Sequence, residues 1–348
     1  MQRVLFPLLM IGLAFLPACQ SSETAKKTDD TSIESRVVDP VTITKTACKG
    51  EAHTKTQPTV DDEKANAAIA DSQTSASKSA SIKTASRKAH EDLDATLWMQ
   101  TSAEYYATCR QAYRLAEKQL ATAIDTPTWS ADVAQQAELS GHQSEKNDLP
   151  TAVILDIDET VLDNSPYQAR RIHEDGSFTP ETWKTWVEEA TASPVPGVKE
   201  FLQVAKNSGV DVFFVTNREN AVEHATRRNL ENLQLVEPDS VDRILSKRER
   251  DEWTSDKATR RAHIAKRYRI LLLVGDDLND FISIGENPTS QARRDLAFEH
   301  ADMWGVKWIQ LPNPNYGGWE RSVYQWNDSA EDHVKLQEKY DALNDAKE

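Results

Sequence analysis

Short runs of mostly apolar residues recur along the chain from residue 152 onward, and they constrain the fold more than any other feature. The four clearest runs occupy residues 152–155, 210–215, 270–274 and 306–309. Each is typical of a strand that is buried on both faces of a parallel sheet. Segments with helical spacing of apolar residues lie between them, at 197–207, 221–232 and 257–268. This alternation predicts an α/β fold, with a Rossmann-like parallel sheet, flanking helices and right-handed crossovers.

Polar and acidic residues stand at the ends of three of these runs. Asp156 and Asp158 follow the first run, Thr216 follows the hydrophobic part of the second, and Asp276 and Asp280 follow the third. In open α/β sheets, ligands bind beyond the carboxyl ends of the strands. We therefore expect these residues to meet at one functional site.

The carboxylates in this set predict a metal ion. Gathering Asp156, Asp158, Asp276 and Asp280 at one place is unfavourable unless a cation offsets their charge. Hard oxygen ligands that leave room for water and phosphate suit Mg²⁺. No His or Cys lies in these clusters, which disfavours zinc and copper. Mg²⁺ is therefore the expected cofactor.

Nearby residues can supply the positive charge and hydrogen-bond donors that a phosphoryl group needs. Thr216 and Asn217 follow the second run, and Lys257 precedes a predicted helix, although Lys247 is a rival for the cationic role. Together with a carboxylate nucleophile, this set suits covalent catalysis through an aspartyl-phosphate. Three further cations are interpreted instead as surface or ion-pair residues, namely Arg218, Arg260 and Arg261.

The order of these motifs resembles that of the haloacid dehalogenase superfamily. The motif residues, in order, are Asp156-x-Asp158-x-Thr160, Thr216, Lys257 and Gly275-Asp276-Asp277-x-x-Asp280. A closer resemblance is to the class C nonspecific acid phosphatases, which are bacterial outer-membrane lipoproteins. It extends from about residue 97 to the C-terminus and is carried by residues 154–167, 274–281 and 314–320. One departure is Asp277, where the family usually has Asn or Thr, and we expect a solvated or turn carboxylate there rather than a ligand.

The resemblance implies that the chain is an acid phosphatase or 5′-nucleotidase. Asp156 would attack phosphorus, and Asp158 would protonate the leaving oxygen and then activate water. Thr216, Asn217 and Lys257 would bind the phosphoryl group. Nucleoside 5′-monophosphates and other small phosphomonoesters would be the substrates.

The resemblance also implies a ligand set for the metal. Magnesium would be held by the carboxylates of Asp156 and Asp276 and by the main-chain carbonyl of Asp158. Asp280 would act through a water molecule.

An insert at residues 163–195 predicts a smaller helical lid between the first two strands. Its aromatic residues Phe178 and Trp183 could stack on a flat leaving group such as a nucleobase, or could pack the lid against the long helix expected over 97–124. Tyr316, in a glycine-rich segment, is a further stacking candidate because glycines allow a ligand to approach closely. Asp163, at the start of the insert, is interpreted as a turn or capping carboxylate.

The N-terminus predicts export and lipid anchoring. An apolar run at residues 4–16 is too short to span a bilayer, and residues 1–18 are interpreted as a signal peptide. Leu16-Pro17-Ala18-Cys19 resembles a bacterial lipobox, in which Cys19 becomes the lipidated N-terminus. Gln20 follows it, in place of the Asp of an inner-membrane retention signal, so we expect an outer-membrane location.

Residues 19–91 predict a disordered tether to a folded domain at 92–348. No Trp, Tyr or Phe occurs between residues 20 and 90, so this segment cannot bury enough apolar surface to fold. A single long helix is expected over 97–124, with Cys109 as a buried, inert thiol, although pairing with Cys48 is left open.

The net charge and the motifs also bear on which partners and which other functions are expected. The formal net charge of −15 disfavours a nucleic-acid polymer as partner. A non-catalytic surface lipoprotein for ligand binding or adhesion is an alternative, although four motifs in order speak against it. Phosphotransfer to an alcohol would use the same site. The oligomeric state is left open, with a dimer included.

Overall fold

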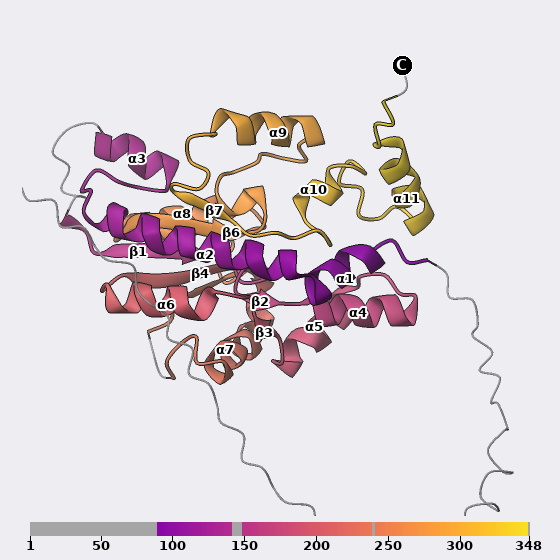
Figure 1. Ribbon diagram of the computed structural model, residues 1–348, viewed down its shortest axis with the longest axis horizontal. Helices are drawn as coiled ribbons and strands as arrows, with labels where there is room; N and C mark the ends of the chain where they lie inside the picture. The colour runs from indigo at the N-terminus through magenta and orange to yellow at the C-terminus, as the bar shows by residue number, and fades with distance from the viewer. Residues whose placement is uncertain (1–88, 141–147, 239–240, 347–348) are drawn as a thin grey trace, which may run out of the picture. The chain divides into compact units, whose positions relative to one another are not determined.

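A five-stranded parallel sheet forms the centre of the computed structural model, which describes residues 89–140, 148–238 and 241–346 (Figure 1). Its strands lie in the order β5-β4-β1-β6-β7. Their bounds are β1 Thr151–Leu155, β4 Asp211–Glu219, β5 Ile244–Lys247, β6 Arg269–Gly275 and β7 Trp308–Gln310. The chain passes from β1 outward to β4 and β5, and then crosses to β6 and β7 on the other side. The winding therefore reverses at β1, where open α/β sheets bind ligands.

Alternate residues of the strands pack into two cores, one on each face of the sheet. Val153 and Leu155 of β1 belong to the core that α2 and α6 cover. Ala152 and Ile154 belong to the opposite core, which α8 covers. The three helices are α2 Ala103–Ile124, α6 Val198–Asn207 and α8 Ala258–Ala265. Burial on both faces explains why the strands are nearly continuous apolar runs.

The helix expected over residues 97–124 is in fact two helices, α1 (Leu93–Thr101) and α2. Ser102 between them has an extended backbone, and its hydroxyl accepts a hydrogen bond of 3.0 Å from the Tyr105 N–H, which caps α2. The single-helix prediction was wrong because the apolar spacing continues across this cap. Cys109 is fully buried on α2, and burial raises the pKa of its thiol to about 12, as expected for an inert group.

The insert at residues 163–195 folds into two helices, and a small antiparallel ladder joins its two ends. Its elements are β2 Leu162–Asp163, α4 Ser165–Glu174, α5 Pro180–Glu189 and β3 Ser193–Pro194. Pairing of β2 with β3 brings the two ends of the insert together. The Asp163 carboxylate accepts a hydrogen bond of 2.8 Å from the Ser165 N–H, which is the turn role expected of it.

The other elements complete the layers and connections. They are α3 Val133–Ser140, η2 Asn220–Val222, α7 Glu223–Asn232, η3 Leu278–Asp280, α9 Ser290–Glu299, α10 Gly318–Arg321 and α11 Asp332–Asp341. The helices predicted at 197–207, 221–232 and 257–268 are present as α6, α7 and α8. Strand β5 and helices α3, α9, α10 and α11 were not predicted.

The predictions for the N-terminus fall outside the described residues. This holds for the signal peptide, for Cys19 with its lipobox, for Cys48 and for most of the tether. Within the described ranges, no helix has the length and apolar character needed to cross a bilayer.

Candidate active site

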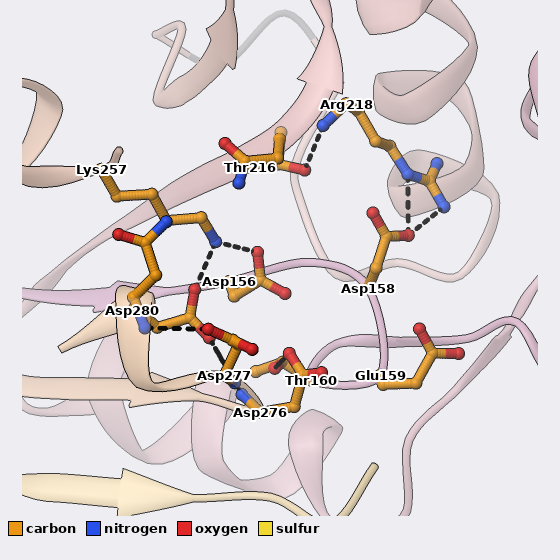
Figure 2. Close-up of polar contacts among 12 residues, drawn as sticks. Asp156, Asp158, Glu159, Thr160, Thr216, Arg218, Lys257, Asp276, Asp277 and Asp280 are labelled. Atoms are coloured by element: carbon orange, nitrogen blue, oxygen red, sulfur yellow. Dashed lines mark hydrogen bonds and ion pairs between the residues drawn. The ribbon is translucent and has the colours of Figure 1, made fainter. Parts of the chain in front are cut away.

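Asp156 and Lys257 form the centre of a buried charged cluster at the end of β1 (Figure 2). The Asp156 N–H donates to the Val274 carbonyl at 2.9 Å, which ties the residue after β1 to β6. Lys257, at the N-cap of α8, donates to the carboxylates of both Asp156 and Asp280. Burial lowers the pKa of Lys257, but these two carboxylates outweigh that effect and raise it overall. The lysine is therefore a fixed cation between two acids, and Lys247 does not occupy that place.

Three carboxylates of this cluster are close enough to share one metal ion. One oxygen from each of Asp156, Asp276 and Asp280 lies within 4.8 Å of the others. Burial raises the pKa of Asp156 to about 7, although Lys257 opposes the shift, and burial raises the pKa of Asp276 well above its usual value. A cation in addition to Lys257 would favour the ionised forms. The all-oxygen donor set fits Mg²⁺.

The turn after β6 holds Asp280 in place. One of its carboxylate oxygens, Oδ2, accepts hydrogen bonds from the N–H groups of Asp276 and Asp277, at 3.0 and 2.9 Å. A Cβ atom at Gly275 would lie only 2.2 Å from the same oxygen, so this position requires glycine. Asp277 caps the short helix η3 and also accepts a hydrogen bond from the Gly318 N–H at 2.6 Å. Of the two roles expected of Asp277, these contacts agree with the turn carboxylate.

The Asp158 carboxylate lies apart from the Asp156, Asp276 and Asp280 trio and is bound by an arginine. The guanidinium of Arg218 donates to Asp158 Oδ1 from both Nε, at 2.9 Å, and Nη2, at 2.8 Å (Figure 2). Arg218 is only 2% exposed, because β4 continues past Thr216 and directs residues 216 and 218 to the same side. Arg218 was interpreted as a surface or an ion-pair residue. The structure shows the ion pair, and the burial of Arg218 contradicts the surface position.

The loop residues that were expected to bind phosphate have other contacts as well. Thr216 is fully buried, and its hydroxyl oxygen accepts a hydrogen bond from the Arg218 N–H at 3.0 Å. Asn217 donates to the Ser255 carbonyl at 3.0 Å and accepts from Arg260 Nη2 at 2.7 Å. Arg260 also donates to the Thr216 carbonyl. These bonds shape the loop that begins at Thr216.

Arg260 and Arg261 are both buried, so the surface interpretation of these residues was wrong. Arg260 is fully buried and Arg261 is 3% exposed. Arg261 Nη1 donates to the carbonyls of Asn279 and Asp280, at 2.9 and 3.1 Å. Both guanidinium groups therefore satisfy main-chain carbonyls beneath the site, a role that a buried arginine performs well because of its several donors.

The site opens into a cavity of about 840 Å³. Its lining includes the three candidates for base stacking, Phe178, Trp183 and Tyr316, and also Asp156, Asp158 and Lys257. Phe178, between α4 and α5, is 55% exposed. The Trp183 ring packs edge-on against Tyr167, with 5.2 Å between ring centroids. The cavity is larger than a phosphate group alone requires, so it has room for a leaving group.

Besides Arg218, sequence reasoning gave no role to two further residues of this site, Glu159 and Asn164. The Glu159 carboxylate is fully buried and accepts hydrogen bonds from Tyr316 Oη and from the Asn164 N–H, the latter at 2.9 Å. Asn164 Nδ2 donates to Asp158 Oδ1 at 2.9 Å. Their position beside the Asp156-x-Asp158 motif was the available signal.

Comparisons with known proteins agree with this geometry. The family described as HAD superfamily, subfamily IIIB (acid phosphatase), matches residues 53–319. The class C acid phosphatase from Bacillus anthracis is 30% identical, with a TM-score of 0.61, over 73% of this chain and 96% of that chain. A crystal structure of class C acid phosphatase from the same organism with tungstate bound is 29% identical, with a TM-score of 0.60, over 73% and 96%. This chain therefore belongs to the acid phosphatases of HAD subfamily IIIB and is a phosphomonoesterase.

Proposed function

We propose that this phosphatase works through an aspartyl-phosphate on Asp156. The observation that carries the proposal is the position of Asp156, which lies at the end of the central strand, lines the cavity and is bound by Lys257. A buried ammonium group stabilises the carboxylate form that attacks phosphorus. The tungstate-bound relative supports a site of this kind, because tungstate is a tetrahedral oxyanion like phosphate.

Two displacements complete the proposed reaction. In the first, an Asp156 oxygen bonds to phosphorus as the bond to the leaving oxygen breaks, and Asp158 gives its proton to that oxygen. In the second, Asp158 takes a proton from water, which attacks phosphorus and releases inorganic phosphate from Asp156. Thr216, Asn217 and Lys257 would bind the phosphoryl oxygens during both steps. The Asp158 carboxylate lines the same cavity as Asp156, which supports its part in both displacements.

Mg²⁺ is the proposed cofactor, held by the carboxylates of Asp156 and Asp276, with Asp280 through water, and by the Asp158 main-chain carbonyl. When bound, it would neutralise negative charge on the phosphoryl oxygens. The donor set and the raised pKa values of Asp156 and Asp276 support a cation there. EDTA should abolish p-nitrophenyl phosphate hydrolysis and added Mg²⁺ should restore it, whereas full activity in EDTA would contradict the metal's role.

Nucleoside 5′-monophosphates are the proposed substrates among other small phosphomonoesters. The aromatic side chains of Phe178, Trp183 and Tyr316 line the cavity and offer surfaces on which a base can stack. A panel of phosphomonoesters, assayed at several pH values with and without Mg²⁺, tests this preference. Equal kcat/KM for nucleotides and for glycerol phosphate would contradict it.

The experiment that tests the nucleophile is Asp156→Asn. This substitution keeps the size of the side chain but removes the attacking carboxylate, so p-nitrophenyl phosphate turnover should be lost. The wild-type enzyme, quenched in acid during turnover, should carry phosphate on Asp156, and the variant should carry none. Retained turnover by a folded Asp156→Asn protein would overturn the assignment.

We also propose that the enzyme is anchored to the bacterial outer membrane through lipidated Cys19. The support is the sequence Leu16-Pro17-Ala18-Cys19 together with the apolar run before it. Cys19→Ser should abolish incorporation of labelled palmitate and release the protein from the membrane fraction. Continued labelling of the variant would place the lipid elsewhere.

A further inference from the structure

The hydrogen bonds of the Asp158 carboxylate are strongly asymmetric. Arg218 Nε, Arg218 Nη2 and Asn164 Nδ2 all donate to Oδ1, at 2.9, 2.8 and 2.9 Å. Within the described ranges, no hydrogen bond to Oδ2 is present, and the side chain remains 18% exposed to the cavity. In Figure 2, both dashed lines from the guanidinium end on the same oxygen of Asp158, and none reaches the other oxygen. The two oxygens of this carboxylate therefore have different environments.

Arg218 is itself held by contacts additional to those with Asp158. Its Nη1 donates to Thr226 Oγ1 at 3.2 Å, and its Nη2 also donates to Asn164 Oδ1 at 3.2 Å. The ring of Trp183 lies over the guanidinium, 5.6 Å from Cζ to the ring centroid. Because the guanidinium is planar and is held at several points, its Nε and Nη2 groups cannot turn freely. They therefore donate to Asp158 from fixed positions.

The orientation of the Asn164 amide is determined by its neighbours. Trp186 Nε1, which can only donate, points to Asn164 Oδ1 at 2.8 Å. The oxygen must therefore face Trp186 and Arg218, which directs Nδ2 to Asp158 Oδ1 and to Glu159 Oε2, the latter at 3.2 Å. Because Trp186 belongs to α5, this contact joins the insert to Asp158.

We infer that Arg218 and Asn164 are positioning residues that keep Oδ1 of Asp158 as an acceptor, so that Oδ2 alone exchanges protons with the leaving group and with water. An oxygen that already accepts three hydrogen bonds is a poor place for a proton. The proton of the acid form therefore resides on Oδ2, the oxygen without these donors. The inference rests on the proposed role of Asp158 as the general acid and base.

The test compares substrates whose leaving groups differ in their need for a proton. For each variant, kcat/KM is measured with 2,4-dinitrophenyl phosphate, phenyl phosphate and glycerol phosphate. This parameter reports the steps up to the aspartyl-phosphate, so it isolates proton delivery to the leaving oxygen. Arg218→Gln should lower kcat/KM by about 100-fold for glycerol phosphate but less than about threefold for 2,4-dinitrophenyl phosphate. An equal loss for all three substrates would overturn the inference.

Two further variants keep the test independent of folding. Trp186→Phe retains a ring in the core but removes the N–H that orients Asn164, and it should produce a smaller loss with the same dependence on the leaving group. Arg269→Gln removes another buried arginine, which donates to the carbonyls of Ala123 and Thr126 away from the site. It should lower stability without any dependence on the leaving group. A leaving-group dependence in Arg269→Gln as large as that in Arg218→Gln would overturn the inference.

Asp158→Asn separates this inference from the function on which it rests. If Asp158→Asn shows no dependence on the leaving group, the general-acid role fails and the inference fails with it. If Asp158→Asn shows a strong dependence but Arg218→Gln does not, only the positioning role is wrong. In the Asp158→Asn background, Arg218→Gln should add no further dependence, because it acts through a carboxylate that is no longer there.

Discussion

The charged end of β1 and the aromatic rim of the same cavity are built in different ways. Lys257 is buried between Asp156 and Asp280, and Arg218 is buried against Asp158, so each charge has a partner at a fixed place. Phe178, on the rim, is more than half exposed. A preorganised charge cluster changes activity greatly when one member is lost, whereas an exposed ring contributes only what it gains by contact with a ligand. The comparison predicts that substitutions in the two regions will affect chemistry and substrate preference separately.

Lys257→Met should show the largest effect within the charge cluster. The substitution leaves Asp156 and Asp280 buried without their shared cation, and we expect kcat/KM for p-nitrophenyl phosphate to fall by about 1,000-fold. Lys247→Met is the matched control, because Lys247 lines the same cavity but its ammonium contacts no carboxylate among the described residues. The control should stay within about threefold of wild type. A similar loss in both variants would remove the distinction between the two lysines.

The affinity for Mg²⁺ should depend on pH, and the expected direction follows from burial. The pKa of Asp156 is raised to about 7 and that of Asp276 is raised well above its usual value, so these groups hold protons at acidic pH when no metal is bound. Mg²⁺ binds the ionised forms and must displace those protons. Half-activation should therefore need about tenfold more Mg²⁺ per pH unit below 7 for each proton released. Activation curves between pH 5 and 8 measure this, and a constant midpoint would contradict it.

Phe178→Ala should alter substrate preference with little effect on the chemistry. We expect kcat/KM for a nucleoside 5′-monophosphate to fall by about fivefold, which is the low end for loss of one stacking ring, and that for glycerol phosphate to stay unchanged. Phe298→Ala is the control, because Phe298 is 82% exposed on α9 and does not line the cavity. Equal losses for both substrates in Phe178→Ala would show that the ring acts on the charge cluster instead.

Tyr316→Phe should have the smallest effect on activity. Tyr316 lies on the aromatic rim, and its hydroxyl reaches Glu159 near the charged end of β1, so it joins these two regions. The Tyr316 hydroxyl donates to the buried Glu159 carboxylate, which also accepts from the Asn164 N–H. Loss of one of these bonds should lower the free energy of unfolding by about 1–3 kcal/mol, and kcat/KM should change by less than about threefold. Thermal unfolding and the nucleotide assay measure the two quantities. An unchanged Tm would mean that this hydrogen bond does not contribute to stability.

Much of the sheet could be predicted because buried parallel strands are short, apolar and regularly separated by helices. Four of the five strands were found in this way. Strand β5 was missed because its apolar part is only Ile244 and Leu245, with polar residues on both sides, so no apolar run marks it. The break at Ser102 was missed because apolar spacing carries no information about a change in backbone direction. Local capping decided that boundary.

Residues of the site that directly follow a strand could be predicted. A long side chain that extends from one strand to a residue after another, as Arg218 of β4 does to Asp158, was harder to predict. The structure brings Asp156, Asp276, Asp280 and Lys257 together as expected, although their roles stay predictions. The place of Arg218 at the site was not predicted, because a charged residue that follows a strand is usually solvated. Its position two residues beyond Thr216 was the missed signal, since alternate residues of a continuing strand share one face.

The central place of β1 also affects when the enzyme can become active. β1 takes its partners from β4 and from β6, which begins at Arg269, and Asn313 still contributes a hydrogen bond of 2.8 Å to Asp276. Pairings between such distant segments form late in folding, because a long loop must close first. A chain that ends before Arg269 therefore contains Asp156 but lacks β6, Asp276 and Asp280. Such a chain cannot assemble the charged cluster, so we expect a truncated protein of this kind to be inactive.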